Sequence, residues 1–268
     1  MHLTKMHGLG NDYLYINCIE KKPEHLPELA IQLSDRHFGV GSDGLICVLP
    51  GDKGDFTMEM YNADGSRGAM CGNGIRCFGK YVYERGLTRK TCLSIDTDAG
   101  QRQLELRVRG GKVEQVRVDM GIPRVLKAVE LLIEEKQRFL YPVDVGNPHA
   151  VCFCEPLEQI PLERLGPVLE VHPALPQRSN VEFVWLPSPE RLKIQVWERG
   201  SGVTLACGTG ACAALAAGVS SGRCERAVTA HLPGGELELQ WSRDTNHIYM
   251  TGGATEVFEC ELSEDYAS

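Results

Sequence analysis

The stretch MCGNGIRC, residues 70–77, decides the fold, because the chain contains a second version of it, ACGTGAC, at residues 206–212. In each stretch a cysteine, Cys71 or Cys207, is followed by Gly-x-Gly and then by a run that is compatible with a helix. Similarity at a fixed spacing indicates a duplicated structural unit. The two stretches therefore predict two similar lobes, each with a cysteine at the start of a helix.

The repeat extends beyond the cysteines. A shift of 136 residues, with no gap, carries Gly10-Asn11 onto Gly146-Asn147 and Gly86 onto Gly222 in a chain of 268 residues. We therefore predict an N-terminal lobe at 1–119, which carries Cys71, and a C-terminal lobe at 120–268, which carries Cys207. In this division the last ~15 residues can pack back on the first lobe. The active site is expected between the lobes.

Composition narrows the class of protein. The chain is 43% hydrophobic and 24% charged, and it contains no apolar run near the ~20 residues that a membrane span requires. Its first residues lack the apolar segment of a secretory signal, so we expect a cytoplasmic protein. Eleven cysteines form an odd count in a chain of this length, which favours free thiols. The net charge of −8 argues against nucleic-acid and membrane partners and favours a small-molecule substrate.

Hydrophobic periodicity predicts an α+β fold with two pseudo-symmetric lobes, in each of which a mostly antiparallel, curled sheet surrounds a central helix. The run ACAALAAGVSS after residue 210 is small and apolar or neutral on every face, and such a helix has to be surrounded by protein. Helices are expected at 23–36 and 73–85. Strands are expected at 2–6, 13–18, 56–62, 103–108, 112–119, 140–145, 149–154, 181–186, 192–198, 227–232, 237–241, 248–251 and 255–260.

The two cysteine turns suggest acid–base chemistry. Glycine after each cysteine allows a ligand to come close, and the first turn of the following helix leaves backbone N–H groups without partners. Those groups favour an anion such as a carboxylate, and the same field is expected to lower the pKa of the adjacent thiol below ~8.5. Two such thiols on opposite sides of the carbon beside a carboxylate would invert that carbon without a cofactor. This is the geometry of a racemase.

A buried cysteine is more often structural than catalytic. We keep that interpretation for Cys77, Cys92, Cys212, Cys224 and Cys260, which lack the paired glycine turns. No metal site is expected, because the spacings of the cysteines do not match the usual zinc pattern.

Several longer motifs resemble the diaminopimelate epimerase family over essentially the whole chain: KMHGLGND, YNADGSRGAMCGNGIRC, VGNPHAV, SNVEF, WERGSGVTLACGTGACA, PGGELELQW and MTGGATEVF. This resemblance implies an enzyme of the diaminopimelate epimerase-like fold that interconverts LL- and meso-diaminopimelate without a cofactor. It also implies that Cys71 and Cys207 are the acid–base pair and that the protein is a homodimer.

The resemblance further implies roles for individual side chains. His149 and Glu198 resemble the residues that tune the catalytic thiols. The implied substrate contacts are Asn11, Asn62, Gly72, Asn73, Asn147, Asn180, Glu198, Arg199, Gly208 and Thr209. Chemically, Arg199 suits a distal carboxylate and Glu198 suits an ammonium group.

Two other functions stay open at this point. The first is a racemase of proline, hydroxyproline or histidine on the same scaffold. Proline racemases typically have Cys-Gly-His at the first turn, where this chain has Cys71-Gly72-Asn73. The second is a thiol redox protein that joins Cys71 to Cys207, although the chain lacks a C-x-x-C motif.

Overall fold

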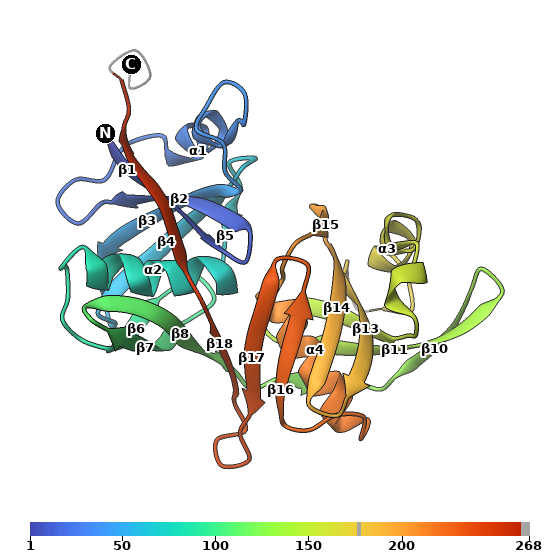
Figure 1. Ribbon diagram of the computed structural model, residues 1–268. Coiled ribbons are helices and arrows are strands. Elements are labelled where there is room, and N and C mark those ends of the chain that lie inside the picture. Colours follow the sequence, from blue (N-terminus) through green and yellow to red (C-terminus); the bar gives the residue numbers. More distant parts are fainter. Residues whose placement is uncertain (176–177, 264–268) are drawn as a thin grey trace. The chain divides into compact units, whose positions relative to one another are not determined.

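Strands make up most of the first unit of the fold, which comprises Met1–Val118 and the chain from Gly252 onward. Figure 1 shows the computed structural model, which describes residues 1–175 and 178–263. The elements of this unit are β1 (His2–Gly8), β2 (Asn11–Asn17), α1 (Leu26–Ser34), β3 (Gly44–Pro50), β4 (Phe56–Asn62), β5 (Arg67–Gly68), α2 (Gly72–Glu84), β6 (Cys92–Asp96), β7 (Arg102–Arg109), β8 (Lys112–Gly121) and β19 (Thr255–Glu261).

The second unit comprises Asp119–Thr251. Its elements are β9 (Arg124–Val125), β10 (Val129–Ile133), β11 (Lys136–Asp144), β12 (Pro148–Phe153), η1 (Leu157–Gln159), α3 (Leu162–Glu170), β13 (Asn180–Ser188), β14 (Arg191–Glu198), β15 (Gly202–Thr204), α4 (Gly208–Ser220), β16 (Ala227–Leu232), β17 (Gly235–Trp241) and β18 (Ile248–Gly252). Among the described residues, no helix has the length and apolar character needed to cross a membrane.

Strand pairing repeats between the units. In the first unit β1 is antiparallel to β2, β2 is parallel to β3, and β3 is antiparallel to β4. In the second unit β11, β12, β13 and β14 pair in the same way. The register repeats as well, because Leu45 is opposite Tyr61 and Val181 is opposite Trp197, a shift of 136 for both partners. The duplication that the sequence predicts is therefore present in the backbone.

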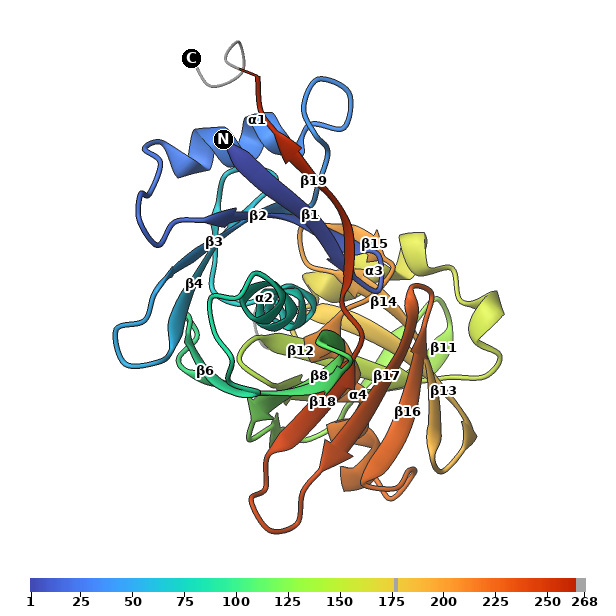
Figure 2. The same ribbon diagram turned by 60° about the vertical axis from the view of Figure 1, so that its left-hand side comes forward.

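Each unit contains a central helix with the same bounds after this shift, α2 and α4. Figure 2 views α2 nearly along its axis, with strands of its own unit curling around it. Every residue of α4 from Ala211 to Gly218 is buried, as expected for a helix without a polar face. Glycines with φ of 71° and 69°, Gly86 and Gly222, follow the two helices, and this left-handed conformation is the common C-terminal cap.

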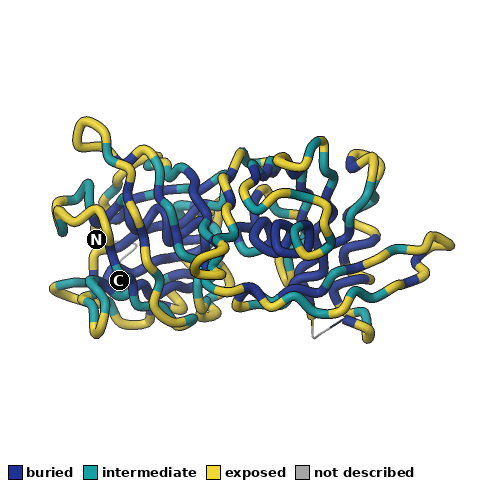
Figure 3. Tube along the Cα trace, turned by 90° about the horizontal axis from the view of Figure 1, so that it is seen from below, coloured by how far each residue is buried: buried dark blue, intermediate teal, exposed yellow. Residues whose placement is uncertain are grey.

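The remaining core is formed by apolar faces of the strands, and exposed positions gather in the loops (Figure 3). In the first unit Leu3, Leu14 and Leu45 pack with α1 through Leu33. In the second unit the core includes α3 residues such as Leu165. The C-terminal strand β19 pairs with β1 of the first unit.

The predicted α+β class and the helix-centred sheets are confirmed, with local differences. Helix α1 is shorter than the predicted 23–36, because the Asp35 carboxylate accepts hydrogen bonds from the backbone N–H groups of His37 and Phe38 and ends the helix in a turn. Helix α3, which contains Pro167, was not expected from the sequence pattern. Strand β10, which pairs with the first residues of β11, was not expected either.

Candidate active site

Cys71 caps the N-terminus of α2. Its backbone is extended, with φ −127° and ψ 121°, and its Sγ accepts a hydrogen bond from the backbone N–H of Gly74 at 3.3 Å. A side chain that accepts from the third residue of a helix is the usual form of an N-terminal cap. The thiol therefore lies at the positive end of the helix.

Cys207 caps α4 in the same way. Its φ and ψ are −119° and 110°, and its Sγ lies 3.3 Å from the backbone N of Gly210. The hydroxyl of Thr209 is 3.4 Å from the same sulfur. The structure thus builds the same cysteine cap twice, once in each unit, at positions that the 136-residue shift relates.

Two asparagines gather around Cys71. The Cys71 thiol donates to Asn11 Oδ1 at 3.2 Å, and Asn73 Nδ2 donates to the same oxygen at 3.4 Å. Asn73 is itself buried, and its Oδ1 accepts from the guanidinium of the fully buried Arg76 at 2.9 Å. Asn62, at the end of β4, donates to the hydroxyl of Ser66 at 2.9 Å. Of the predicted site side chains in this unit, Cys71, Asn11 and Asn73 are therefore directly connected. Asn62 is hydrogen-bonded to Ser66 instead.

Side chains from β12 and β13 meet in the second unit. His149 is buried, its Nε2 lies 3.0 Å from Asn147 Oδ1, and its Nδ1 lies 2.7 Å from Glu182 Oε1. Asn180 Nδ2 donates to the carbonyl oxygen of Pro148 at 3.5 Å. These contacts connect His149 directly to Asn147 and hold Asn180 against the backbone of Pro148, which lies between Asn147 and His149 in the sequence.

Glu198 and Arg199 follow at the end of β14. The hydroxyl of Thr204 donates to Glu198 Oε1 at 2.6 Å. The backbone N–H of Arg199 donates to Asn180 Oδ1 at 2.8 Å, and one guanidinium nitrogen donates to the carbonyl oxygen of Arg178 at 3.3 Å. The predicted residues Asn180 and Arg199 are therefore in direct contact.

The pKa of the Cys207 thiol differs from the sequence-based expectation. Burial raises the pKa of this thiol well above its usual range, and the negative charges of Glu198 and Glu182 raise it further, against hydrogen bonds from Thr209 and Gly210 that lower it. The prediction of a lowered pKa is wrong for Cys207, because the charges and the loss of solvent outweigh the field of the helix. Burial likewise raises the pKa of the Glu198 carboxyl.

Sequence reasoning missed Glu182, whose side chain is fully buried beside His149 and the start of α4. Its signal was a single acidic residue within the apolar strand VEFVW, where an ordinary core strand would have none. It also missed Tyr13, which the 136-residue shift relates to His149. Burial and the charge of Cys71 raise the pKa of Tyr13 well above its usual range.

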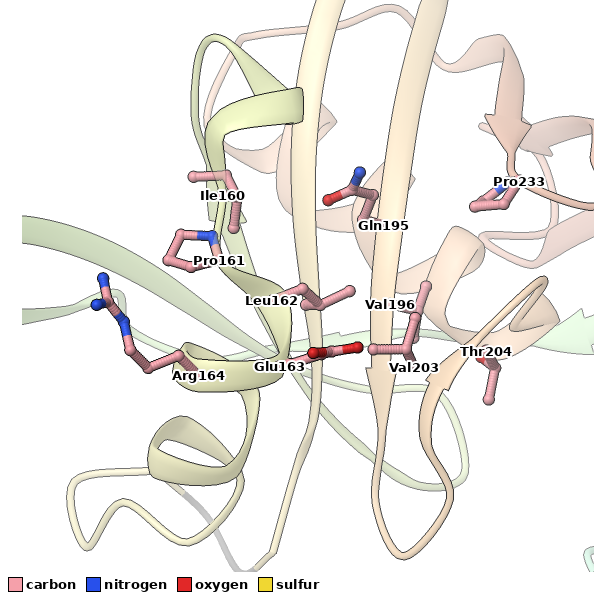
Figure 4. Close-up of a pocket in the computed structure, with 10 residues that line it drawn as sticks. All are labelled: Ile160, Pro161, Leu162, Glu163, Arg164, Gln195, Val196, Val203, Thr204 and Pro233. Atoms are coloured by element: carbon pink, nitrogen blue, oxygen red, sulfur yellow. The ribbon is translucent and has the colours of Figure 1, made fainter.

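The pockets of the second unit include two of different size. One of about 200 Å³ is lined by Asn147 and His149 together with Arg124, Leu126, Val143, Asp144, Gly146 and Pro148. A larger one of about 420 Å³ lies between α3 and β14–β15 (Figure 4) and contains none of the predicted site residues. The smaller pocket is therefore lined in part by predicted site residues.

Comparisons with known proteins agree on the family. The family model described as diaminopimelate epimerase matches residues 3–126 and 141–257. A diaminopimelate epimerase of Acetivibrio thermocellus is 48% identical over 98% of both chains. One from Methanococcus maripaludis is 50% identical over 98% of this chain and 99% of its own.

Solved structures share the fold at low sequence identity. A probable proline racemase from Agrobacterium radiobacter has a TM-score of 0.76 at 16% identity and covers 98% of this chain and 93% of its own. A Bacillus anthracis phenazine biosynthesis protein has a TM-score of 0.76 at 15% identity, with 98% and 99% coverage. These likenesses establish the architecture.

Proposed function

This chain belongs to the diaminopimelate epimerase family, and from that membership we propose that it interconverts LL- and meso-diaminopimelate for lysine biosynthesis. The observation that carries the proposal is the pair of cysteine-capped helices, α2 and α4. In each, a cysteine Sγ lies 3.3 Å from a first-turn backbone N–H. A catalyst that inverts a carbon needs one acid and one base, and the repeat supplies two equivalent groups.

In the proposed reaction the thiolate of one cysteine takes the α-proton of the substrate. The electron pair of the broken C–H bond stays on the α-carbon and spreads into the adjacent carboxylate, whose growing charge the helix N-termini stabilise. The thiol of the other cysteine then gives its proton to the opposite face. Each turnover exchanges the protonation states of Cys71 and Cys207, and no cofactor is required.

The neighbouring side chains suit the two ends of this substrate. Gly72 and Asn73 begin α2, and Gly208 and Thr209 begin α4, so their backbone N–H groups belong to the first turns. They are assigned to the carboxylate beside the reacting carbon. Glu198 is assigned to the ammonium group. Arg199 is assigned to the distal carboxylate, because a guanidinium holds a carboxylate through two parallel hydrogen bonds.

The remaining assignments follow from the polar groups around the thiols. Asn11, Asn62, Asn147 and Asn180 offer neutral donors and acceptors to the substrate. His149 and Glu198 are assigned to tuning the protonation of the thiols, in keeping with the effect of Glu198 on the pKa of Cys207.

We also propose a cytoplasmic homodimer. The eleven cysteines are all free thiols, which suits a reducing compartment. Strand β19 exposes two large apolar side chains, Val257 and Phe258, at 52% and 40%, and a dimer contact on this strand would remove them from water.

The decisive experiment incubates the reduced, purified protein with LL-diaminopimelate in deuterated water without any cofactor. We expect meso product that carries deuterium at the inverted α-carbon. A parallel panel contains proline, hydroxyproline and histidine. Inversion of a panel amino acid without conversion of diaminopimelate would contradict the proposed substrate, and absence of labelled product from every substrate would contradict the epimerase proposal itself.

A further inference from the structure

Glu182 is a buried carboxylate that has no role in the reaction as proposed above. It lies in β13, and neither its side chain nor that of His149 is exposed to solvent. Its Oε1 lies 2.7 Å from His149 Nδ1. Its Oε2 is buried and has no hydrogen-bond partner among the described residues. A buried carboxylate that is only half satisfied destabilises the folded protein, so the fold alone does not account for it.

The duplicated scaffold supplies an internal comparison. The 136-residue shift relates Glu182 to Ile46 and His149 to Tyr13. Ile46 is fully buried at the corresponding place in the first unit, where the end of its side chain faces Gly74 of α2. The same strand position is therefore compatible with an apolar residue. A carboxylate at this place is a property of the second unit and of its histidine.

The start of α4 holds the carboxylate against the histidine. A Cβ atom on Gly210 would lie 2.5 Å from Glu182 Oε1, so only glycine leaves room for the carboxylate at this helix position. Gly210 is also the residue whose backbone N–H donates to Cys207 Sγ. Glu182 thus connects the ring of His149 to the turn that carries the proposed catalytic thiol.

Hydrogen-bond chemistry decides what the contact does. A carboxylate only accepts hydrogen bonds when it is ionised, so a histidine nitrogen at 2.7 Å from it must carry the proton. Nδ1 is then occupied as N–H. Nε2 lies 3.0 Å from Asn147 Oδ1, an acceptor, so Nε2 donates to Asn147 when it carries a proton and is the nitrogen at which the imidazole gains or loses one. This is how a buried carboxylate selects one tautomer of a catalytic imidazole.

We propose that Glu182 is a positioning residue that holds His149 through Nδ1–H and thereby leaves Nε2, on the side of Asn147, as the nitrogen through which His149 tunes the catalytic thiols. The inference rests on the proposed function, because it takes His149 to be a part of the site. Glu182 does not touch the substrate in this proposal. Its effect on the reaction passes through the orientation and tautomer of His149.

The test uses Glu182→Gln, which keeps the size of the side chain but removes the charge and offers a donor. Nitrogen-15 NMR of ring-labelled protein identifies His149 by the loss of its signals in His149→Asn. In the wild type we expect the His149 Nδ1 signal of a protonated nitrogen. In Glu182→Gln we expect that signal to move toward the unprotonated value. We also expect kcat to fall about 10- to 100-fold, as for other buried partners of functional histidines, with a much smaller change in KM.

Glu84→Gln is the matched control. The Glu84 side chain is only 4% exposed and binds Lys80 and Lys112 near the C-terminal end of α2, away from the proposed site residues. Its His149 signals and kcat should equal those of the wild type. Glu182→Asp, which retains the charge, covers the case in which Glu182→Gln does not fold, and it should keep Nδ1 protonated.

Unchanged His149 signals or a wild-type kcat in folded Glu182→Gln would overturn the inference. If Glu182→Gln does not fold and Glu182→Asp does, loss of the protonated His149 Nδ1 signal in Glu182→Asp would overturn the inference. The NMR measurement is made on free protein, so it reports on Glu182 even if diaminopimelate proves not to be the substrate. Failure of the proposed function and failure of this inference are therefore distinguishable.

Discussion

Cys207 differs from an ordinary thiol because it is buried near two carboxylates, and its pKa is raised for both reasons. A raised pKa means that the thiolate, the form that reacts with iodoacetamide, appears only at higher pH. We expect the alkylation rate of Cys207 to be still rising above pH ~9, where a thiol of ordinary pKa levels off. Glu198→Gln removes one negative charge and should move the profile down by about one pH unit. Peptide mass spectrometry at a series of pH values measures both.

The exposed Cys92 is the internal control for this experiment. Its alkylation profile should be the same in the wild type and in Glu198→Gln, because solvent screens an exposed thiol from the charge of another residue. A Cys207 profile that is complete below pH ~8.5 in the wild type would contradict the raised pKa.

Arg199 is expected to select substrates with a second carboxylate. Arg199→Met removes the guanidinium and should lower kcat/KM for diaminopimelate about 100-fold, the scale of a lost charge-assisted pair of hydrogen bonds. The loss for a monocarboxylate amino acid should be much smaller. Arg178→Met is the matched control, since it removes a nearby guanidinium that binds Glu170 but keeps the backbone carbonyl that contacts Arg199. Equal losses for both kinds of substrate in Arg199→Met would contradict the assignment.

At the level of elements, the starts of α2 and α4 have the same backbone but different neighbours. An alanine Cβ at residue 74 would meet the methyl end of Ile46 at 2.7 Å, and at residue 210 it would meet the Glu182 carboxylate at 2.5 Å. Ile46 can shift its terminal methyl group, whereas the carboxylate is held by His149. We expect Gly74→Ala to change the free energy of unfolding by less than ~1 kcal/mol and Gly210→Ala to destabilise by about 1–3 kcal/mol.

Thermal and urea unfolding of the two glycine variants, together with kcat, tests this difference. The variants are matched controls for each other, because each adds one methyl group at the third residue of a buried helix. Equal losses of stability would mean that the Glu182 side chain moves aside as easily as that of Ile46. Glu182 would then not hold His149 in a fixed position.

The same elements show how far the sequence could predict the structure. The bounds of α2 and α4 and their cysteine caps follow from the repeat and from the lack of a polar face in α4, which are local properties of the chain. Glu182 could not be predicted in the same way. Its neighbours come from β12 and α4, and the repeat places an isoleucine at the corresponding position. Helix α3 could not be predicted from local pattern either, because it contains Pro167. Proline normally breaks a helix, and a helix that contains it depends on tertiary packing.

Across the whole molecule, the two duplicated units have the same backbone arrangement but different buried charges. In the first unit Arg76 is fully buried and donates to the carbonyl oxygen of Gly72 at 3.0 Å, so a positive charge lies at the first turn of α2. The shift relates Arg76 to the neutral Cys212. In the second unit the buried charge beside the corresponding turn is the negative one of Glu182. The two thiols therefore have different electrostatic surroundings, which suits a pair in which one is a base while the other is an acid.

Because a single chain carries both cysteine-capped helices, we expect each chain of the proposed homodimer to supply both acid–base groups of its own site. Cys71→Ala and Cys207→Ala should each lower kcat by at least 1,000-fold, as for other essential groups, with far-UV circular dichroism unchanged. When the two variants are co-expressed with different tags and the doubly tagged dimer is isolated, it should be as inactive as its parents. A dimer of either variant with a wild-type chain, the control, should retain about half of the wild-type activity if the chains work independently. Recovery of activity in the dimer of the two variants would show that cysteines of different chains cooperate, and appreciable turnover by either variant alone would contradict the two-base mechanism.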